Sequence, residues 1–151
     1  MCTYYTDLNK TRPKDSYSSI DRLVDGAAGH KVLSFLDAYS GYNQIPMNLA
    51  NREKTTFLDE RANFCYEVMP FGLKNVEETY QRLMYRMFWE QIGKNVEVYV
   101  NDMIVKSDSA EQHATDLTEI FGQVRWYGMR LNLEKCVYDV EGGKIFGLHA
   151  D

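Results

Sequence analysis

The sequence predicts one α+β domain in which helices cover one face of an antiparallel sheet. Two pairs of short apolar segments each flank a polar turn, a pattern typical of β-hairpins. Two longer segments repeat apolar residues at three- and four-residue spacing, which is typical of amphipathic helices. These patterns alternate along 151 residues without repeats, and the 44% apolar content is enough for a core.

The first predicted elements are a short helix and a buried strand. Ser18 or Ser19 could cap a helix through residues 24–28, and Gly29 would end it. Residues 31–37, K-V-L-S-F-L-D, form a short apolar run that fits a buried strand. This strand would end on a carboxylate.

A hairpin and a long helix are expected next. Residues 54–58 and 64–69 flank the polar turn 59–63, and the Pro-Phe-Gly that follows should break the second strand. Residues 75–91 then carry their apolar side chains on one helical face. Gly93 is expected to end this helix.

The second hairpin lies at residues 96–105, V-E-V-Y-V-N-D-M-I-V. The sequence places its turn at Asn101-Asp102, because Asn and Asp tolerate positive φ and hydrogen-bond locally. Taken alone, this turn could be an ordinary solvated hairpin tip.

The last predicted elements are a helix and two strands. Ser107 or Ser109 could cap the helix, which would run to Gly128. Residues 130–133 and 144–148 are the strand candidates. The predicted order is therefore β, ββ, α, ββ, α, β, β.

Charge and cysteine content limit the function classes. A net charge of −5 has the wrong sign for a surface that attracts phosphate backbones as a whole, so a nucleic-acid role needs a local site, bound cations or neighbouring domains. Cys2, Cys65 and Cys136 are far apart and odd in number, which favours neither a disulfide framework nor a zinc site. An intracellular reducing compartment, cytoplasm or nucleus, is expected, and no apolar run predicts contact with a membrane.

Several motifs in a fixed order resemble one enzyme family. They are L-S-F-L-D-A-Y-S-G-Y-N-Q-I at 33–45, V-M-P-F-G-L-K at 68–74, T-Y-Q-R at 79–82, Y-V-N-D at 99–102, L-N-L-E-K-C at 131–136 and I-F-G at 145–147. Together they resemble the reverse transcriptase domain in the Pol polyprotein of Ty3/gypsy-class long-terminal-repeat retrotransposons. The resemblance covers nearly the whole chain.

This resemblance implies the palm of a right-hand polymerase with incomplete fingers, forming one reverse transcriptase domain over residues 1–151. The thumb and ribonuclease H domains would lie outside the chain. The implied activity is RNA-directed DNA synthesis by two-metal nucleotidyl transfer, with two Mg²⁺ ions, or Mn²⁺, as cofactors. The implied partners are an RNA or DNA template-primer, deoxynucleotides and other parts of a Pol polyprotein.

The resemblance also assigns the metal ligands. Asp37 matches the first metal-binding aspartate, and Asn101-Asp102 match the paired aspartates of the hairpin tip. Carboxylates suit this role because magnesium prefers hard oxygen ligands. Without its context, Asp37 could equally be an ordinary strand-end carboxylate.

Four further residues match functional positions of the family. Tyr42 matches an aromatic steric gate against ribonucleotides, with ordinary packing as the alternative. Phe71 and Gly72 match the loop that shapes the nucleotide pocket, although a turn that ends a strand explains them as well. Lys135 matches a lysine that helps to protonate the leaving pyrophosphate, and a solvated lysine is the alternative.

Departures from the family pattern point to impaired catalysis. Asn101 replaces an aspartate, and a neutral amide binds a divalent ion less well than a carboxylate does. Glu77 and Glu78 replace small residues near the expected template and nucleotide, where their charge would repel phosphate. The alternative function is therefore a non-catalytic retrotransposon remnant that acts at most as a folded interaction module.

Overall fold

The computed structural model describes residues 25–142 of the chain. The described residues form two compact units, each of which is considered by itself. The first unit is Ser40–Tyr80, and the second unit combines residues 25–39 with residues 81–142.

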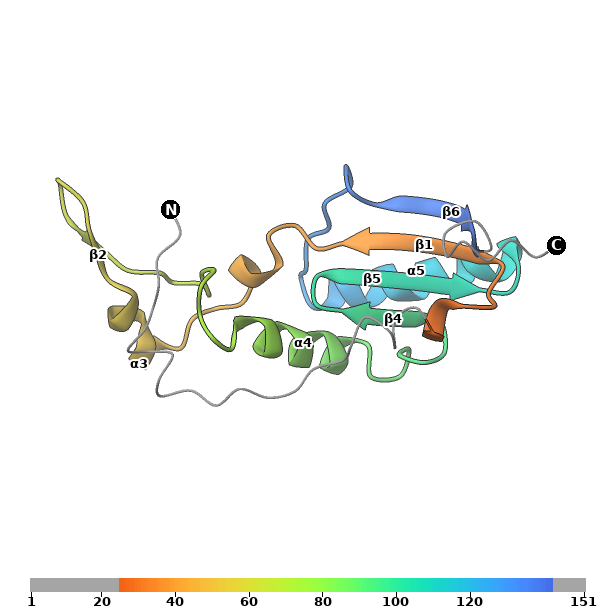
Figure 1. The fold of residues 1–151 in the computed structure, drawn as a ribbon, viewed down its shortest axis with the longest axis horizontal. Coiled ribbons are helices and arrows are strands. Elements are labelled where there is room, and N and C mark those ends of the chain that lie inside the picture. Colours follow the sequence, from red (N-terminus) through yellow and green to blue (C-terminus); the bar gives the residue numbers. More distant parts are fainter. Residues whose placement is uncertain (1–24, 143–151) are drawn as a thin grey trace. The chain divides into compact units, whose positions relative to one another are not determined.

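The second unit is built on a four-stranded antiparallel sheet (Figure 1). Its strands lie in the order β4 (Val96–Tyr99), β5 (Asp102–Ser107), β1 (Val32–Asp37) and β6 (Val137–Glu141). The predicted buried strand and the predicted second hairpin are therefore confirmed. Strand β1 lies between β5 and β6, so a segment from early in the chain forms the middle of the sheet.

One face of this sheet is covered by α5 (Ala110–Trp126), which lies behind the strands in Figure 1 and packs on β5 and β1. Because side chains alternate across a strand, Leu36 and Met103, which pair in register, share this face with Ser34. All three side chains are buried. A helix on one face of an antiparallel sheet is the arrangement that the sequence predicts.

The opposite face carries Leu33 and Ile104, which form a small core cluster with Ala27. By the same alternation, Asp37 and Asp102 point to this face. Ala27 belongs to a short helical stretch that covers residues 25–27, and Gly29 follows it with a φ of +84°. This agrees with the predicted first helix, whose capping serines lie outside the described residues.

Both long helices follow their predicted spacing. Helix α5 begins after Ser109, whose side chain accepts a hydrogen bond from the amide of Gln112, so Ser109 rather than Ser107 is the cap. Helix α4 (Val76–Met87) ends four residues earlier than predicted, in a turn before Gly93. The apolar stripe of α4 is buried at Val76, Tyr80, Met84 and Met87, and Phe88, the residue after the helix, is buried too.

The first unit contains more helical turns than the sequence predicts. Its elements are η1 (Gly41–Gln44), α3 (Leu49–Arg52), η2 (Glu53–Thr55), β2 (Phe57–Leu58) and β3 (Asn63–Phe64). The predicted first hairpin exists, because β2 and β3 pair antiparallel, but each strand has only two residues. Asn48 caps α3 and starts a run of helical turns that takes up the first residues of the predicted strand.

The predictions for the end of the chain were less accurate. The predicted strand at residues 130–133 is reduced to a single bridge between Leu131 and Ala38, and residues 144–148 lie outside the described residues. Strand β6 was not predicted, because it is an edge strand with mostly exposed side chains and no clear apolar alternation.

Within residues 25–142, no helix is long and apolar enough to cross a bilayer.

Candidate active site

The tip of the β4–β5 hairpin lies one residue earlier than predicted. Tyr99 pairs with Asp102, so the two turn residues are Val100 and Asn101, and Asp102 is the first residue of β5. Val100 has a φ of +51°, which is unusual for a β-branched residue. The prediction of an Asn101-Asp102 turn was wrong because turn propensity favours Asn and Asp, whereas the pairing of the two strands selects Val100 and Asn101.

Two carboxylates meet at this end of the sheet. Asp37 is the last residue of β1 and lies directly opposite Asp102 of β5. Side chains that are directly opposite on one face are close neighbours, and like charges at such positions repel. Partial burial raises the pKa of Asp102 above its ordinary value, the charge of Asp37 raises it further, and Lys135 opposes both effects.

Asn101 completes the tip with a neutral side chain. Its main-chain oxygen accepts a hydrogen bond from the amide of Ala38 at 3.4 Å, which links the turn to the end of β1. Its side-chain Oδ1 is buried and has no hydrogen-bond partner. Across residues 25–142, no group of three or more His, Cys, Asp or Glu side chains is arranged to hold a metal ion. The tip therefore offers two carboxylates and one unused amide oxygen.

Lys135 lies beside the carboxylates. The main-chain amide of Asn132 donates to the main-chain oxygen of Asp37 at 2.8 Å. The main-chain amide of Lys135 donates to the main-chain oxygen of Asn132 at 3.0 Å. This turn brings Lys135 Nζ to 3.9 Å from Asp37 Oδ2, with 72% of the lysine side chain exposed. An exposed ion pair of this kind contributes little to stability, so the amine remains available to a ligand.

The residues predicted to bind the nucleotide lie in the first unit. The ring of Tyr42 packs edge-on against Phe71 with centroids 5.2 Å apart, and against Tyr80 at 5.4 Å. Tyr42 is only 5% exposed, whereas Phe71 is 56% exposed. Gly72 follows with a φ of +95°, which a residue with a side chain adopts only under strain. The structure therefore brings these residues together and gives Tyr42 a packing role.

Glu78 is the more unusual of the two glutamates that depart from the family pattern. It is 3% exposed, and neither of its carboxylate oxygens has a hydrogen-bond partner. Glu77, the residue before it, is exposed. An unpaired buried carboxylate is unfavourable, so Glu78 is expected to destabilise the start of α4.

Sequence reasoning missed the role of Gln81. Its side chain is 2% exposed and hydrogen-bonds to the backbone of the hairpin tip. The motif T-Y-Q-R at 79–82 contains this residue, and that motif was the only signal for it. Apolar periodicity cannot identify a buried amide, since Gln is counted as polar.

A polar cluster beneath α5 was also missed. His113 Nε2 lies 2.7 Å from Ser34 Oγ, and His113 Nδ1 lies 2.8 Å from Ser107 Oγ. Ser107 in turn donates to Asp116 Oδ2 at 2.5 Å. Burial lowers the pKa of His113 below its ordinary value, although the charges of Asp139 and Asp116 raise it in part.

Comparisons with known proteins agree with the motif order. Residues 4–149 match the family model described as reverse transcriptase (RNA-dependent DNA polymerase). The retrovirus-related Pol polyprotein from transposon 412 of Drosophila melanogaster is 32% identical over 136 residues, which cover 89% of this chain and 11% of that polyprotein. The corresponding polyprotein from transposon gypsy of the same organism is 30% identical over 145 residues, or 95% of this chain and 14% of that one.

A solved structure shares the fold. The foamy viral protease-reverse transcriptase dRH, determined in complex with ds DNA, superposes with a TM-score of 0.80 at 21% sequence identity. The match covers 91% of this chain and 24% of the foamy viral chain. The chain therefore corresponds to a small part of its relatives, since it spans 11% of the transposon 412 polyprotein and 14% of the gypsy polyprotein.

Proposed function

This chain belongs to the reverse transcriptase family, and from that premise we propose that it supports nucleotidyl transfer in RNA-directed DNA synthesis, in an impaired form. Its antiparallel sheet with a covering helix is the palm of that fold. One observation carries the proposal: Asp37 and Asp102 lie opposite each other at the end of one sheet face. This arrangement suits a site for divalent cations.

The chemistry of the donor set fits such a cation. Two opposed carboxylates repel each other, and a divalent ion between them would remove that repulsion. Asp37 and Asp102 would hold the ion, and the unused Oδ1 of Asn101 is a neutral oxygen close in sequence to Asp102. Bound magnesium or manganese would supply Lewis-acid activation of the attacking primer 3′-hydroxyl and stabilise the leaving pyrophosphate.

The other residues that match functional positions of the family are each proposed to act on the substrate. Lys135, with its amine beside Asp37, would neutralise and protonate the leaving pyrophosphate. Phe71 and Gly72 would shape the nucleotide pocket, and Tyr42 would exclude the 2′-hydroxyl of a ribonucleotide once its ring is uncovered. Deoxynucleotides are therefore the proposed substrates.

The proposed nucleic-acid partner is an RNA or DNA template-primer. The foamy viral relative was determined with ds DNA, which supports this class of ligand. The net charge of −5 predicts weak binding by this chain alone, because phosphate contacts need a basic surface. Other parts of a Pol polyprotein are the proposed source of that surface.

Asn101 is the proposed cause of impairment. Two ions carry more charge than Asp37 and Asp102 can neutralise, and the amide adds none. If the missing carboxylate is worth about 4 kcal/mol in the transition state, the rate is about 10³-fold lower, because each step of about 1.4 kcal/mol is tenfold.

Primer extension on an RNA template, with magnesium or manganese, tests this proposal. We expect the Asn101→Asp variant to extend primers about 10³-fold faster than the parent chain and to bind manganese more tightly. Asn63→Asp is the matched control, because it adds the same charge at an exposed position in β3.

Each outcome decides one part of the proposal. Equal rates for the parent and the Asn101→Asp variant would show that Asn101 does not impair the site. Unchanged manganese affinity in that variant would show that the side chain at position 101 does not contribute to metal binding. Tighter manganese binding without extension by either form would favour the non-catalytic interaction module, which Asn101 already supports.

A further inference from the structure

The side chain of Gln81 makes two hydrogen bonds to the hairpin that carries Asn101 and Asp102. Its Nε2 donates to the main-chain oxygen of Val98 at 3.2 Å. Its Oε1 accepts from the main-chain amide of Val100 at 2.6 Å. Both partners are backbone atoms, so the contact does not depend on which side chains occupy the hairpin.

This pair of hydrogen bonds completes the edge of the sheet. Strand β4 is an edge strand, and Val98 and Val100 are two residues apart, so their backbone groups point to the same side. An edge strand leaves such groups without a strand partner. The primary amide of Gln81 takes the place of one peptide unit of the missing strand, because it donates and accepts at the same spacing.

The position of the contact is also informative. Val100 is a β-branched residue with a φ of +51°, a conformation that persists only when the surrounding structure supports it. The amide of this residue is the group that Gln81 holds. Gln81 is 2% exposed, so water does not compete for the contact.

We propose that Gln81 is a positioning residue that holds the strained Val100 turn and thereby keeps Asn101 and Asp102 in place beside Asp37. This inference rests on the proposed function, because it assigns Gln81 a task in the divalent-cation site. Within residues 25–142, the hydrogen bonds of the Gln81 side chain go to backbone atoms, so Gln81 would act through Val100.

The chemistry of the amide makes the proposal specific. Methionine has nearly the same length, but it cannot donate to Val98, and its thioether sulfur is only a weak acceptor for Val100. An ionised glutamate could still accept from Val100, but it has no donor for the Val98 oxygen. Gln81→Met should therefore remove both contacts, and Gln81→Glu should remove one.

The test is a double-mutant cycle in the full chain with Gln81→Met and Val100→Gly. Glycine adopts positive φ without strain, so the turn in the Val100→Gly background no longer needs support. We expect Gln81→Met to weaken manganese binding, followed by electron paramagnetic resonance, about tenfold, because, of the two lost hydrogen bonds, the one to the Val100 amide holds the turn. In the Val100→Gly background the same change should have less than about a threefold effect.

Hydrogen exchange of the Val100 amide gives a second readout, which depends on neither metal binding nor activity. Gln81→Met should speed this exchange about tenfold or more, while the amide of Ile104 within the β4–β5 ladder exchanges as before. Gln91→Met is the matched control, since Gln91 is a buried glutamine of the second unit that donates to Glu119 instead. If Gln81→Met does not fold, Gln81→Leu takes its place, because its side chain has neither a donor nor an acceptor.

The possible results separate this inference from the proposed function. Unchanged Val100 exchange in Gln81→Met, or in Gln81→Leu where that variant replaces it, would overturn the contact. Equal effects on manganese binding in both Val100 backgrounds would overturn positioning through the turn. A parent chain whose manganese binding is insensitive to Asp37→Asn would overturn the proposed metal site and with it the positioning role, whereas Val100 exchange would still decide the contact.

Discussion

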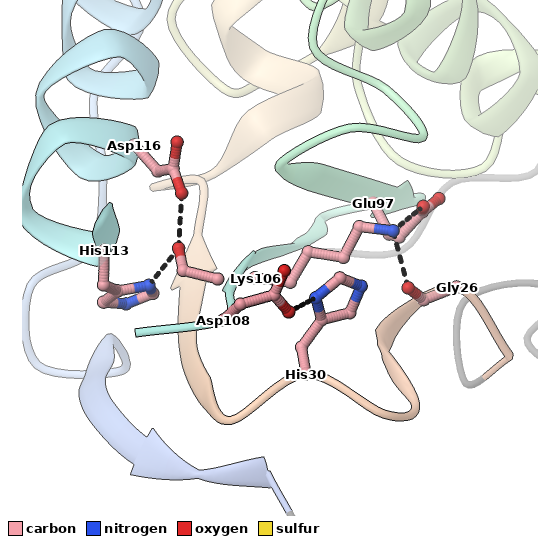
Figure 2. Close-up of polar contacts among 8 residues, drawn as sticks. Gly26, His30, Glu97, Lys106, Asp108, His113 and Asp116 are labelled. Atoms are coloured by element: carbon pink, nitrogen blue, oxygen red, sulfur yellow. Dashed lines mark hydrogen bonds and ion pairs between the residues drawn. The ribbon is translucent and has the colours of Figure 1, made fainter. Parts of the chain in front are cut away.

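The two ends of strand β5 place opposite charges on the same face of the sheet, but only one end satisfies its charge. Lys106 Nζ donates to Glu97 Oε1 at 2.8 Å and to the main-chain oxygen of Gly26 at 2.6 Å, as Figure 2 shows. At the other end, Asp102 faces the like charge of Asp37. The first end is internally neutralised, whereas the second lacks a counter-charge of equal strength.

The face beneath α5 resembles the Lys106 end. His113 and Asp116 come from the helix and meet Ser107 of β5, so each of these three side chains has a hydrogen-bond partner (Figure 2). Burial would raise the pKa of Asp116, but hydrogen bonds from Ser107, Asn95 and Gln112 lower it. The protein itself therefore stabilises the charged form of this carboxylate.

This difference separates polar groups that the protein itself satisfies from polar groups that it leaves unsatisfied. Where the protein supplies every partner, a polar group contributes to stability and specificity. At the hairpin tip, two carboxylates repel each other and the Oδ1 of Asn101 has no hydrogen-bond partner. A cationic ligand would therefore make favourable contacts there that the protein itself does not make. Three measurements can break or sharpen this contrast.

The largest expected effect is on catalysis at the unsatisfied end. In the Asn101→Asp background, Asp37→Asn should lower primer extension by about 10³-fold, because it removes a carboxylate of the proposed metal site. It should leave thermal stability unchanged or slightly higher, since it also removes the repulsion with Asp102. A clear loss of stability in thermal unfolding would show that Asp37 is a structural residue instead.

The next effect is on stability at the satisfied end. Lys106→Met leaves Glu97 largely buried without its cation, and breaking a buried pair in this way costs about 3 kcal/mol or more. Lys135→Met is the matched control, because its ion pair with Asp37 is exposed and should change the free energy of unfolding by less than about 1 kcal/mol. Equal losses in urea unfolding would erase the contrast between the two ends.

The smallest effect is a pH dependence from His113. Its pKa is lowered from 6.5 in the folded chain, so the unfolded chain binds a proton more readily. Stability from the neutral imidazole is thus fully present above pH 6.5 and falls, by at most about 1.4 kcal/mol per pH unit, as the pH drops towards the folded pKa. His113→Gln should abolish this slope in urea unfolding and His30→Gln should keep it; a slope that survives His113→Gln would assign it elsewhere.

Much of the fold could be predicted from local patterns. The apolar runs at β1, β4 and β5 and the helical spacing of α4 and α5 are properties of the chain itself, and the structure confirms them. Strand β6 could not be predicted, because an edge strand with exposed side chains has no apolar alternation. The first hairpin is shorter than predicted because Asn48 starts a run of helical turns before it.

The site was predictable in its residue types but not in its geometry. The motifs identify Asp37, Asp102 and Lys135, and the structure places all three at one end of the sheet. The motifs do not reveal that the turn is Val100-Asn101, because strand pairing rather than turn propensity selects the two residues. The buried Gln81 amide could be identified only in the structure, where it hydrogen-bonds to backbone groups that have no partner in a neighbouring strand.

The sequence by itself determined the family, the order of most elements and the substitution at Asn101, because these depend on which residues stand where. Only the tertiary structure decided which polar groups are satisfied. Ser107 bonds His113 instead of capping α5, and the Oδ1 of Asn101 is left without a partner. Whether a polar group has a hydrogen-bond partner depends on residues that are distant in sequence. Hydrophobic pattern and local propensity therefore cannot predict it.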